Sequence, residues 1–360
     1  MVHVVRKNIN DAIKYLSDKI IFGFGCGLQG RRSGYYLSEW GLREKTKAFI
    51  DNDVLKIGHQ MEYLGCEYPI IGLNDAIKMI DEYEKYGKKC IILVTSISHN
   101  EIYRQIEETC QDRDLYCMSM DEIAGEQLKV SDYDGIVKEY SEKKIPKIIH
   151  YAWLGGEKPD SIKRNIDNWH KICPDYEFKE WNEYNYDISK NVYMKEAYSQ
   201  RVWGFVPDYL RLDVVYQMGG IYLDTDIELI KKPDDLLFQG AFGCCDCSFT
   251  LNLGGGFGAV PYHSMIKKLR DYYNDIHFIK EDGSLDITTC SSHQLILLSG
   301  MGYKNNDTLQ NIGGMNIYPM IFQGANIYMR EYKTSNKTYW IHYGLSLIHI
   351  SEPTRPISIS

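Results

Sequence analysis

Residues 203–229 read WGFVPDYLRLDVVYQMGGIYLDTDIEL, and this stretch decides the fold of the second half of the chain. Residues 208–217 have helical spacing, so Asp208 and Arg211, three positions apart, share one face of a predicted helix. The glycine pair at 219–220 follows the last apolar turn, where glycine is the usual stop signal. The stretch therefore predicts a helix that carries an acidic and a basic side chain on one face and ends at the glycine pair.

Directly after the glycines, residues 221–223 predict a short apolar strand with Asp224 and Asp226 at its carboxyl tip. Two carboxylates separated by one residue point toward the same small volume. Hard divalent cations such as Mn²⁺ or Mg²⁺ prefer oxygen ligands of this kind and also bind substrate phosphates. The pattern therefore predicts a metal site in which Asp226 and Asp224 are ligands.

The first part of the chain alternates apolar runs with helical patterns, which is typical of βαβ units and a parallel sheet. Strands are predicted at residues 19–24, 46–51, 89–95 and 114–118, and helices at 28–40, 74–86 and 99–110. The predicted fold class is α/β, with a small Rossmann-like parallel-sheet domain in front of a second α/β domain.

A glycine motif lies where the first of these strands turns into a helix. Gly25, Gly27 and Gly30 satisfy GxGxxG, and Asp51 ends the second strand. Such glycines let backbone amides approach a diphosphate, and the acid can bind a ribose hydroxyl. The same glycines also serve tight turning and helix–strand packing alone, so a nucleotide site here is one of two interpretations.

The composition excludes several classes of protein. A net charge of −8 and a pI near 5.7 provide no field that attracts nucleic acid. The beginning of the chain has no apolar segment of the signal-peptide type. The ten cysteines form no regular framework, and the cluster at 244, 245 and 247 has no partner pair with zinc-finger spacing. We therefore expect a cytoplasmic protein with reduced thiols.

Four segments follow from these patterns. We expect the Rossmann-like module at 1–125, a charged helical linker at 126–144 and the second domain at 145–344. Residues 345–360 resemble the translation of a sequencing adapter, so we expect them to be non-native and leave them out of the fold prediction.

The second domain resembles glycosyltransferase family 32, the sugar-binding DXD-motif group of initiating mannosyltransferases and capsular polysaccharide transferases. The resemblance is carried by residues 145–155 (IPKIIHYAWLG), 208–211 (DYLR), 219–226 (GGIYLDTD) and 338–342 (TYWIH). The first domain resembles small Rossmann-like modules fused to bacterial sugar-modifying enzymes, whose second strand typically reads as residues 49–53 (FIDND) do.

The family resemblance implies a GT-A type fold, a nucleotide-sugar donor, Mn²⁺ or Mg²⁺, and retention of anomeric configuration. It also implies roles for individual residues. Asp208, Arg211 and Asp224 would be catalytic, and Asp226, Asp224 and His342 would hold the metal. The donor would contact His150, Trp153, Asp208, Arg211, Tyr222 and Asp224, and the glycine-rich turn at 254–258 adds Asn252. Either front-face displacement or attack by Asp208 or Asp246 is open for the mechanism.

The acceptor that this resemblance implies is a polysaccharide or a lipid-linked oligosaccharide, at the inner face of the membrane with possible peripheral association. Two alternatives stay open. The N-terminal domain could act as a nucleotide-sugar or NAD(P)-dependent sugar-modifying enzyme, although it has no helical Tyr-x-x-x-Lys pair. The chain could also be a non-catalytic carbohydrate or nucleotide-sugar binding protein, against which the intact acid pair argues.

Overall fold

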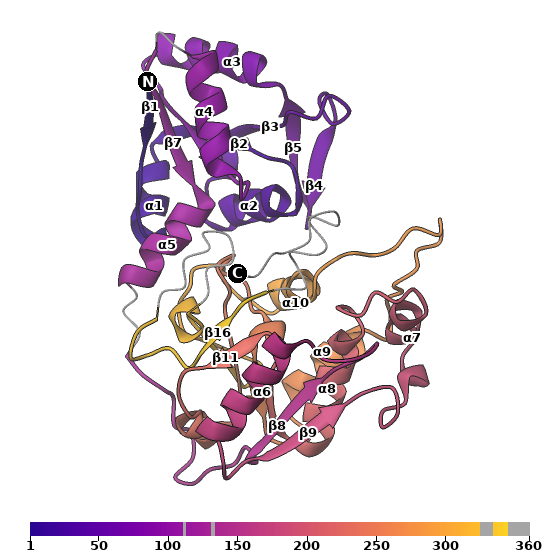
Figure 1. Cartoon of the computed structure of the whole chain (residues 1–360). Helices are drawn as coiled ribbons and strands as arrows, with labels where there is room; N and C mark the ends of the chain where they lie inside the picture. The colour runs from indigo at the N-terminus through magenta and orange to yellow at the C-terminus, as the bar shows by residue number, and fades with distance from the viewer. Residues whose placement is uncertain (111–112, 131–133, 325–333, 345–360) are drawn as a thin grey trace.

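The structure is a computed structural model that describes residues 1–110, 113–130, 134–324 and 334–344. It contains two seven-stranded sheets, one above the other in Figure 1, and a small two-stranded sheet beside the lower one. The mixed α/β class with sheets rich in parallel strands is therefore confirmed. The narrower labels, Rossmann-like for the first part and GT-A type for the second, stay predictions.

The first sheet is parallel except at one edge, where β4 and β5 form an antiparallel hairpin. In spatial order its strands are β1 (Val2–Val4), β7 (Leu115–Ser119), β6 (Lys89–Val94), β2 (Lys19–Phe24), β3 (Thr46–Ile50), β5 (Cys66–Ile71) and β4 (Gln60–Tyr63). The helices around it are α1 (Ile9–Leu16), α2 (Leu28–Glu39), α3 (Leu73–Lys85), α4 (His99–Thr109) and α5 (Met120–Val130).

The central strands form because their apolar runs are covered on both faces. β6 is buried along its whole length after Lys89, as a strand between two layers of helices should be. One face packs on α3 and α4 in a separate apolar cluster. The core on the other face continues without a break into that of the second sheet.

The second sheet mixes parallel and antiparallel neighbours. In order its strands are β14 (Gln310–Ile312), β15 (Met315–Tyr318), β12 (Ala241–Cys244), β13 (Phe257–Ala259), β10 (Gly220–Tyr222), β8 (Ile148–Ala152) and β9 (Glu177–Trp181). The small sheet pairs β11 (Ile227–Leu229) with β16 (Trp340–His342). The helices here are α6 (Asp160–Ile172), α7 (Val192–Ser199), α8 (Pro207–Met218), α9 (Ser264–Tyr272) and α10 (Cys290–Ser299).

The predicted helix and its glycine stop are confirmed. α8 ends at Met218, and Gly219 follows with a φ of 66°, a left-handed value that favours glycine. A Cβ at Gly220 would lie 2.8 Å from the carbonyl oxygen of Ile148. The two glycines thus let β10 turn back against β8, and this turn sets the direction of the acidic pair.

Some elements differ from the predictions. β1 and the β4–β5 hairpin were not predicted; β1 and β4, with three and four residues, carry too little periodicity to be recognised. The helical linker expected at 126–144 is wrong from residue 134 onward. There the amides of Glu139 and Lys144 donate to the carbonyls of Phe238 and Leu237, so tertiary partners replace the bonds of a helix. The expected non-native tail lies outside the described residues.

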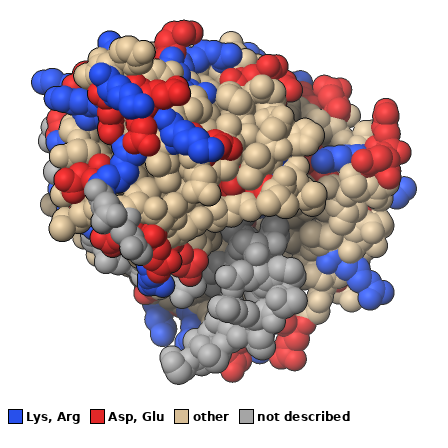
Figure 2. All heavy atoms as spheres, turned by 90° about the horizontal axis from the view of Figure 1, so that it is seen from above, with Lys and Arg blue, Asp and Glu red and all other residues tan. Residues whose placement is uncertain are grey.

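The upper face of the molecule, as it is oriented in Figure 1, carries both positive and negative side chains. Figure 2 shows lysines and arginines interspersed with acidic side chains on that face. Among the described residues, no helix combines the length and the apolar character needed to cross a bilayer.

The GxGxxG turn yields a test of its packing role. A Cβ at Gly30 would lie 1.8 Å from the carbonyl oxygen of Gly25, whereas a Cβ at Gly27 meets nothing within 4 Å. Gly30→Ala should lower the free energy of unfolding by about 3 kcal/mol, because backbone must move. Gly27→Ala, which needs no left-handed φ, should cost less than about 1 kcal/mol. Urea unfolding of both variants measures this, and equal effects would contradict the packing role.

Candidate active site

The acidic turn lies between β10 and β11. The amide of Leu223 donates to the carbonyl of His150, and α6 holds the turn from outside. Asn165 Nδ2 donates to the carbonyl of Thr225 at 2.9 Å, and Trp169 Nε1 donates to that of Ile227 at 2.9 Å. The backbone between the two carboxylates is therefore fixed by a neighbouring helix.

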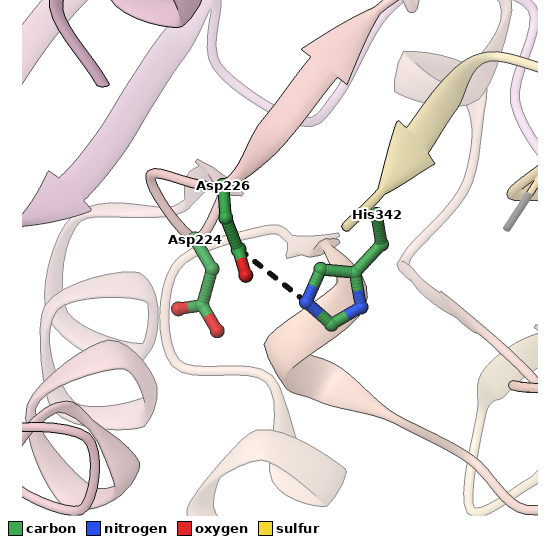
Figure 3. A group of neighbouring side chains, drawn as sticks. All are labelled: Asp224, Asp226 and His342. Carbon is green, nitrogen blue, oxygen red and sulfur yellow. Dashed lines mark ion pairs between the residues drawn. The ribbon is translucent and has the colours of Figure 1, made fainter. Parts of the chain in front are cut away.

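His342 completes a three-residue group with Asp224 and Asp226. β16 pairs antiparallel with β11, so that His342 lies opposite Ile227, next to the acidic turn. His342 Nε2 lies 3.4 Å from Asp226 Oδ1, and the three side chains point toward one another in Figure 3. One ligand atom of each lies within 4.8 Å of the others.

These donors fit a small divalent cation. A shell of ligands about 2.1 Å from an ion places neighbouring donors roughly 3 Å apart and opposite donors about 4 Å apart. The two carboxylates match the preference of Mn²⁺ and Mg²⁺ for oxygen ligands, and the imidazole adds a nitrogen ligand of the kind that transition metals accept. Asp224, Asp226 and His342 are thus the residues that could hold the predicted metal.

Burial changes the charge balance of this group. Burial raises the pKa of the Asp224 carboxyl, although the nearby Arg211 guanidinium opposes the shift. Burial lowers the pKa of His342, but the carboxylates of Asp226 and Asp224 outweigh it and leave that pKa above its ordinary value. The site therefore holds several buried negative groups that need positive partners.

Arg211 supplies one such partner. Its Nη2 lies 3.1 Å from Asp208 Oδ1 and 3.5 Å from Asp224 Oδ1, and the Asp208 and Arg211 side chains are only 3% exposed. The ring of Tyr222 lies under the guanidinium, 5.5 Å away. Burial raises the pKa of Asp208 to about 7 despite this cation. The predicted helix pair is thus confirmed as a buried ion pair that also contacts the acidic turn.

A small pocket of about 50 Å³ opens over these groups. It is lined by Gly204, Phe205, Asp208, Arg211, Asp224, Asn252, Gly254, Thr289, Cys290, Ser291 and His342. Asn252 Oδ1 accepts from the amide of Gly254 at 3.0 Å, which places that glycine beside Arg211 and Asp224. The pocket lining therefore brings together Asp208, Arg211, Asp224 and the glycine turn that the sequence singled out, and Asp226 lies behind it next to His342.

A wider groove lies next to this pocket along the chain. It is lined by Gly155, Tyr198, Ser199, Arg201 and Trp203, and its volume is about 580 Å³. Trp203 precedes Gly204 of the pocket and packs so closely on Gly155 that a Cβ there would lie 2.5 Å from the indole. Trp153, two residues before Gly155, donates from Nε1 to the carbonyl of Gly156 at 2.8 Å. Trp153 is partly exposed and lies two residues before Gly155, which lines the groove.

His150 is placed differently from the prediction. It is fully buried, its Nε2 lies 2.8 Å from the carbonyl oxygen of Gly219, and its Nδ1 accepts from Trp181 Nε1. With both nitrogens engaged by the protein, it supports the sheet and has no atom left for a donor. Tyr222 is likewise buried and packs on Arg211, outside the pocket lining. The structure thus gives these two side chains supporting contacts, and their expected donor contacts stay predictions.

The N-terminal glycine motif is also used internally. Asp51 Oδ2 accepts from the amide of Cys26 at 2.9 Å, so this acid binds the glycine loop itself. Gly25 has a φ of 112°, and Gly30 lies against it. These contacts match the turning and packing interpretation, and the nucleotide interpretation of Gly25, Gly27, Gly30 and Asp51 stays a prediction without further support.

Sequence reasoning missed several residues of the site. They are Asn165, Cys290 and Ser291. Folding brings each of them to its neighbours in the site, and no local spacing in the sequence marks them. The hydrogen bond from Asn165 ends on a backbone carbonyl, which leaves no pattern in the sequence.

With this geometry in view, the comparisons with known proteins show what the chain is similar to. Residues 159–242 match the family model described as a glycosyltransferase sugar-binding region containing the DXD motif. That range holds Asp208, Arg211, Asp224 and Asp226. The resemblance to DXD-motif glycosyltransferases is therefore confirmed, and the comparisons support sugar transfer.

Individual relatives agree. The chain is 29% identical over 177 residues to an uncharacterized glycosyltransferase of Acanthamoeba polyphaga mimivirus, covering 46% of this chain and 68% of that protein. It is 30% identical over 125 residues to inositol phosphoceramide mannosyltransferase 2 of Schizosaccharomyces pombe, covering 31% of this chain. The chain spans 34% of the length of that mannosyltransferase, so only part of it is compared.

The buried ion pair yields a stability prediction. Arg211→Met removes the cation and leaves the carboxylates of Asp208 and Asp224 without it. This should lower the free energy of unfolding by about 3–5 kcal/mol. Arg31→Met, at an exposed arginine of α2, should change it by less than about 0.5 kcal/mol. Urea unfolding decides, and similar values for the two variants would contradict the pairing.

His150 should show its burial in a pH titration. Burial lowers its pKa to about 4. The imidazole NMR signals should therefore stay constant from pH 8 to about 5, where an unperturbed histidine titrates near 6.5. Because the unfolded chain takes up this proton at higher pH, the stability contribution of His150 falls as the pH drops from about 6.5 toward 4. A midpoint near 6.5 would refute the buried neutral ring.

Proposed function

We propose that this protein is a metal-dependent, retaining glycosyltransferase that moves a sugar from a nucleotide-sugar donor to a polysaccharide or lipid-linked oligosaccharide acceptor. The observation that carries the proposal is the Asp224, Asp226 and His342 group, which lies beside the buried Asp208–Arg211 pair at one pocket. A non-catalytic binding protein has no need for so many buried carboxylates, each of which costs stability.

The residues divide the work. Asp226, Asp224 and His342 would hold Mn²⁺ or Mg²⁺, which when bound supplies positive charge that stabilises a leaving diphosphate. Asp208 accepts hydrogen bonds from sugar hydroxyls, and Arg211 holds Asp208 and Asp224 in place. The glycine turn at Gly254 lets the sugar approach this pair closely, because no side chain stands there.

In the transfer, the bond between the anomeric carbon and the phosphate oxygen breaks. A bond from the acceptor hydroxyl oxygen to that carbon forms, and the hydroxyl proton passes to the leaving diphosphate. We favour attack from the same face over a covalent intermediate. Asp208 is tied to Arg211, which lies 3.1 Å from its Oδ1 and would have to release that oxygen before it could attack. Asp246 accepts from the amide of Ser248 and does not line the pocket.

The groove beside the pocket is the place for the rest of the donor. Its volume of about 580 Å³ suits a nucleoside, and Trp203 and Tyr198 provide aromatic surface for a base. Trp153, partly exposed nearby, is the predicted stacking residue. The donor would thus lie with its base in the groove and its sugar in the pocket.

The acceptor class comes from the relatives. Three of them are named inositol phosphoceramide mannosyltransferases, which makes a glycolipid with a phosphate-bearing headgroup a candidate beside polysaccharide. We propose work in the cytoplasm, at the inner face of a membrane, where lipid-linked acceptors are accessible.

Calorimetry with UDP-glucose, UDP-galactose and GDP-mannose, each with and without Mn²⁺, tests the proposal. One nucleotide class should bind only with Mn²⁺. Asp226→Asn should weaken that binding at least about tenfold, because it removes a charged ligand. Asp282→Asn, a carboxylate that serves only its own exposed loop, is the matched control and should bind as the unchanged protein does.

Two results would overturn the proposal. One is the absence of binding by every donor in the presence of Mn²⁺. The other is binding that depends neither on Mn²⁺ nor on the carboxylate of Asp226.

A further inference from the structure

Helix α2 of the first sheet lies against the start of α10, which forms a wall of the pocket. The two helices belong to different sheets, and Figure 1 shows α2 at the lower edge of the upper sheet, above α10. Hydrogen bonds between their side chains show that they are in contact.

The main contact is the guanidinium of Arg32, which is 2% exposed. Its Nη2 donates to Thr289 Oγ1 at 2.8 Å, Ser291 Oγ at 2.8 Å and Ser292 Oγ at 2.5 Å. A buried charge is costly unless it is hydrogen-bonded. Three hydroxyls at the start of α10 surround this nitrogen and share its two hydrogens, which holds that turn against Arg32.

The residues that Arg32 holds are themselves part of the site. Thr289 and Ser291 line the pocket, and Cys290 lies between them. Cys290 Sγ is 3.7 Å from Arg211 Nη1 and 3.8 Å from Asn252 Oδ1. A shift of residues 289–291 would therefore open the pocket wall beside Arg211, whose guanidinium contacts Asp224 of the acidic turn.

Helix α2 holds a second wall segment as well. The hydroxyls of Tyr36 and Thr250 are 2.6 Å apart and buried. Thr250 lies two residues before Asn252 of the pocket. The electrostatics agree, because burial raises the pKa of nearby Asp246 and the positive charge of Arg32 counters that rise.

Other contacts of α2 reach a region away from the pocket. Glu39 Oε2 accepts from Asn305 Nδ2 at 2.6 Å, and Trp40 Nε1, one residue past the helix, donates to the carbonyl of Asn305. None of these three residues lines the pocket. The interface thus has one set of contacts on the pocket wall and one set elsewhere, which allows a matched comparison.

We infer that Arg32 is a positioning residue for the donor pocket: its guanidinium, contributed by the first sheet, sets the place of the α10 turn against which the donor sugar binds. This inference rests on the proposed function for the nature of the ligand. It makes the first sheet a part of the transferase unit, whatever else that sheet binds.

The test compares Arg32→Ala with Glu39→Gln, which changes the same interface away from the pocket. The first readout needs no donor: the rate at which a thiol reagent labels Cys290, followed by peptide mass spectrometry. Of the cysteines in the described residues, only Cys290 is partly exposed. Its labelling rate therefore measures how accessible this wall of the pocket is. Arg32→Ala should raise this rate severalfold over both the unchanged protein and Glu39→Gln.

The second readout is donor binding with Mn²⁺. Arg32→Ala should raise the dissociation constant about tenfold or more, while Mn²⁺ binding alone, measured without nucleotide, stays unchanged. Arg32→Lys should restore part of the affinity, since an ammonium keeps the charge but not the planar fork. Glu39→Gln should leave donor affinity unchanged even if it lowers the melting temperature.

The outcomes separate the two ideas. If the unchanged protein binds no donor, the proposed function fails, and Cys290 labelling still decides the positioning role. Equal labelling rates in Arg32→Ala and Glu39→Gln overturn the inference, as do equal donor affinities. If Arg32→Ala does not fold, Arg32→Lys and Ser292→Ala, which removes one acceptor outside the pocket lining, are compared with Glu39→Gln by the same criteria.

Discussion

The site depends on one constraint: the charges carried by a helix that is buried around most of its circumference must be paired. α8 buries every residue from Asp208 to Val215, so its acids and its arginine are almost entirely withdrawn from water. Arg211 satisfies Asp208 on its own helix and Asp224 on the following turn. The orientation of the acidic turn, and hence of the candidate metal site, follows from this shared guanidinium.

The same physical rule connects the two sheets. Arg32 is as deeply buried as Arg211, and its guanidinium donates hydrogen bonds to hydroxyls at the edge of the pocket. The apolar core also runs from one sheet into the other. The start of α10, which forms one wall of the pocket, therefore contacts the first sheet as well as the second. Support of this wall is a role that does not require the first sheet to bind a nucleotide.

Much of the fold could be predicted because its signals are local. Buried parallel strands such as β2 and β6 have continuous apolar runs, and the glycine pair after α8 marks a helix end by conformation alone. β1 and the segment at 134–144 could not be predicted. Their conformation depends on partners such as β7 and the carbonyl of Phe238, which lie far along the chain.

The sequence by itself determined the acidic pair at one strand tip and the acid and arginine on one helix face, because backbone geometry fixes the positions of residues within one turn. The motifs that these residues form also determined the class of enzyme that the chain resembles. The family resemblance also led us to expect His342 beside Asp226, and the pairing of β16 with β11 brings them together. Only the tertiary structure decided that His150 is enclosed and that Arg32 contacts the pocket wall. Those contacts arise from strand pairing and from the packing of two sheets. Such long-range packing depends on the whole core, and no local spacing encodes it.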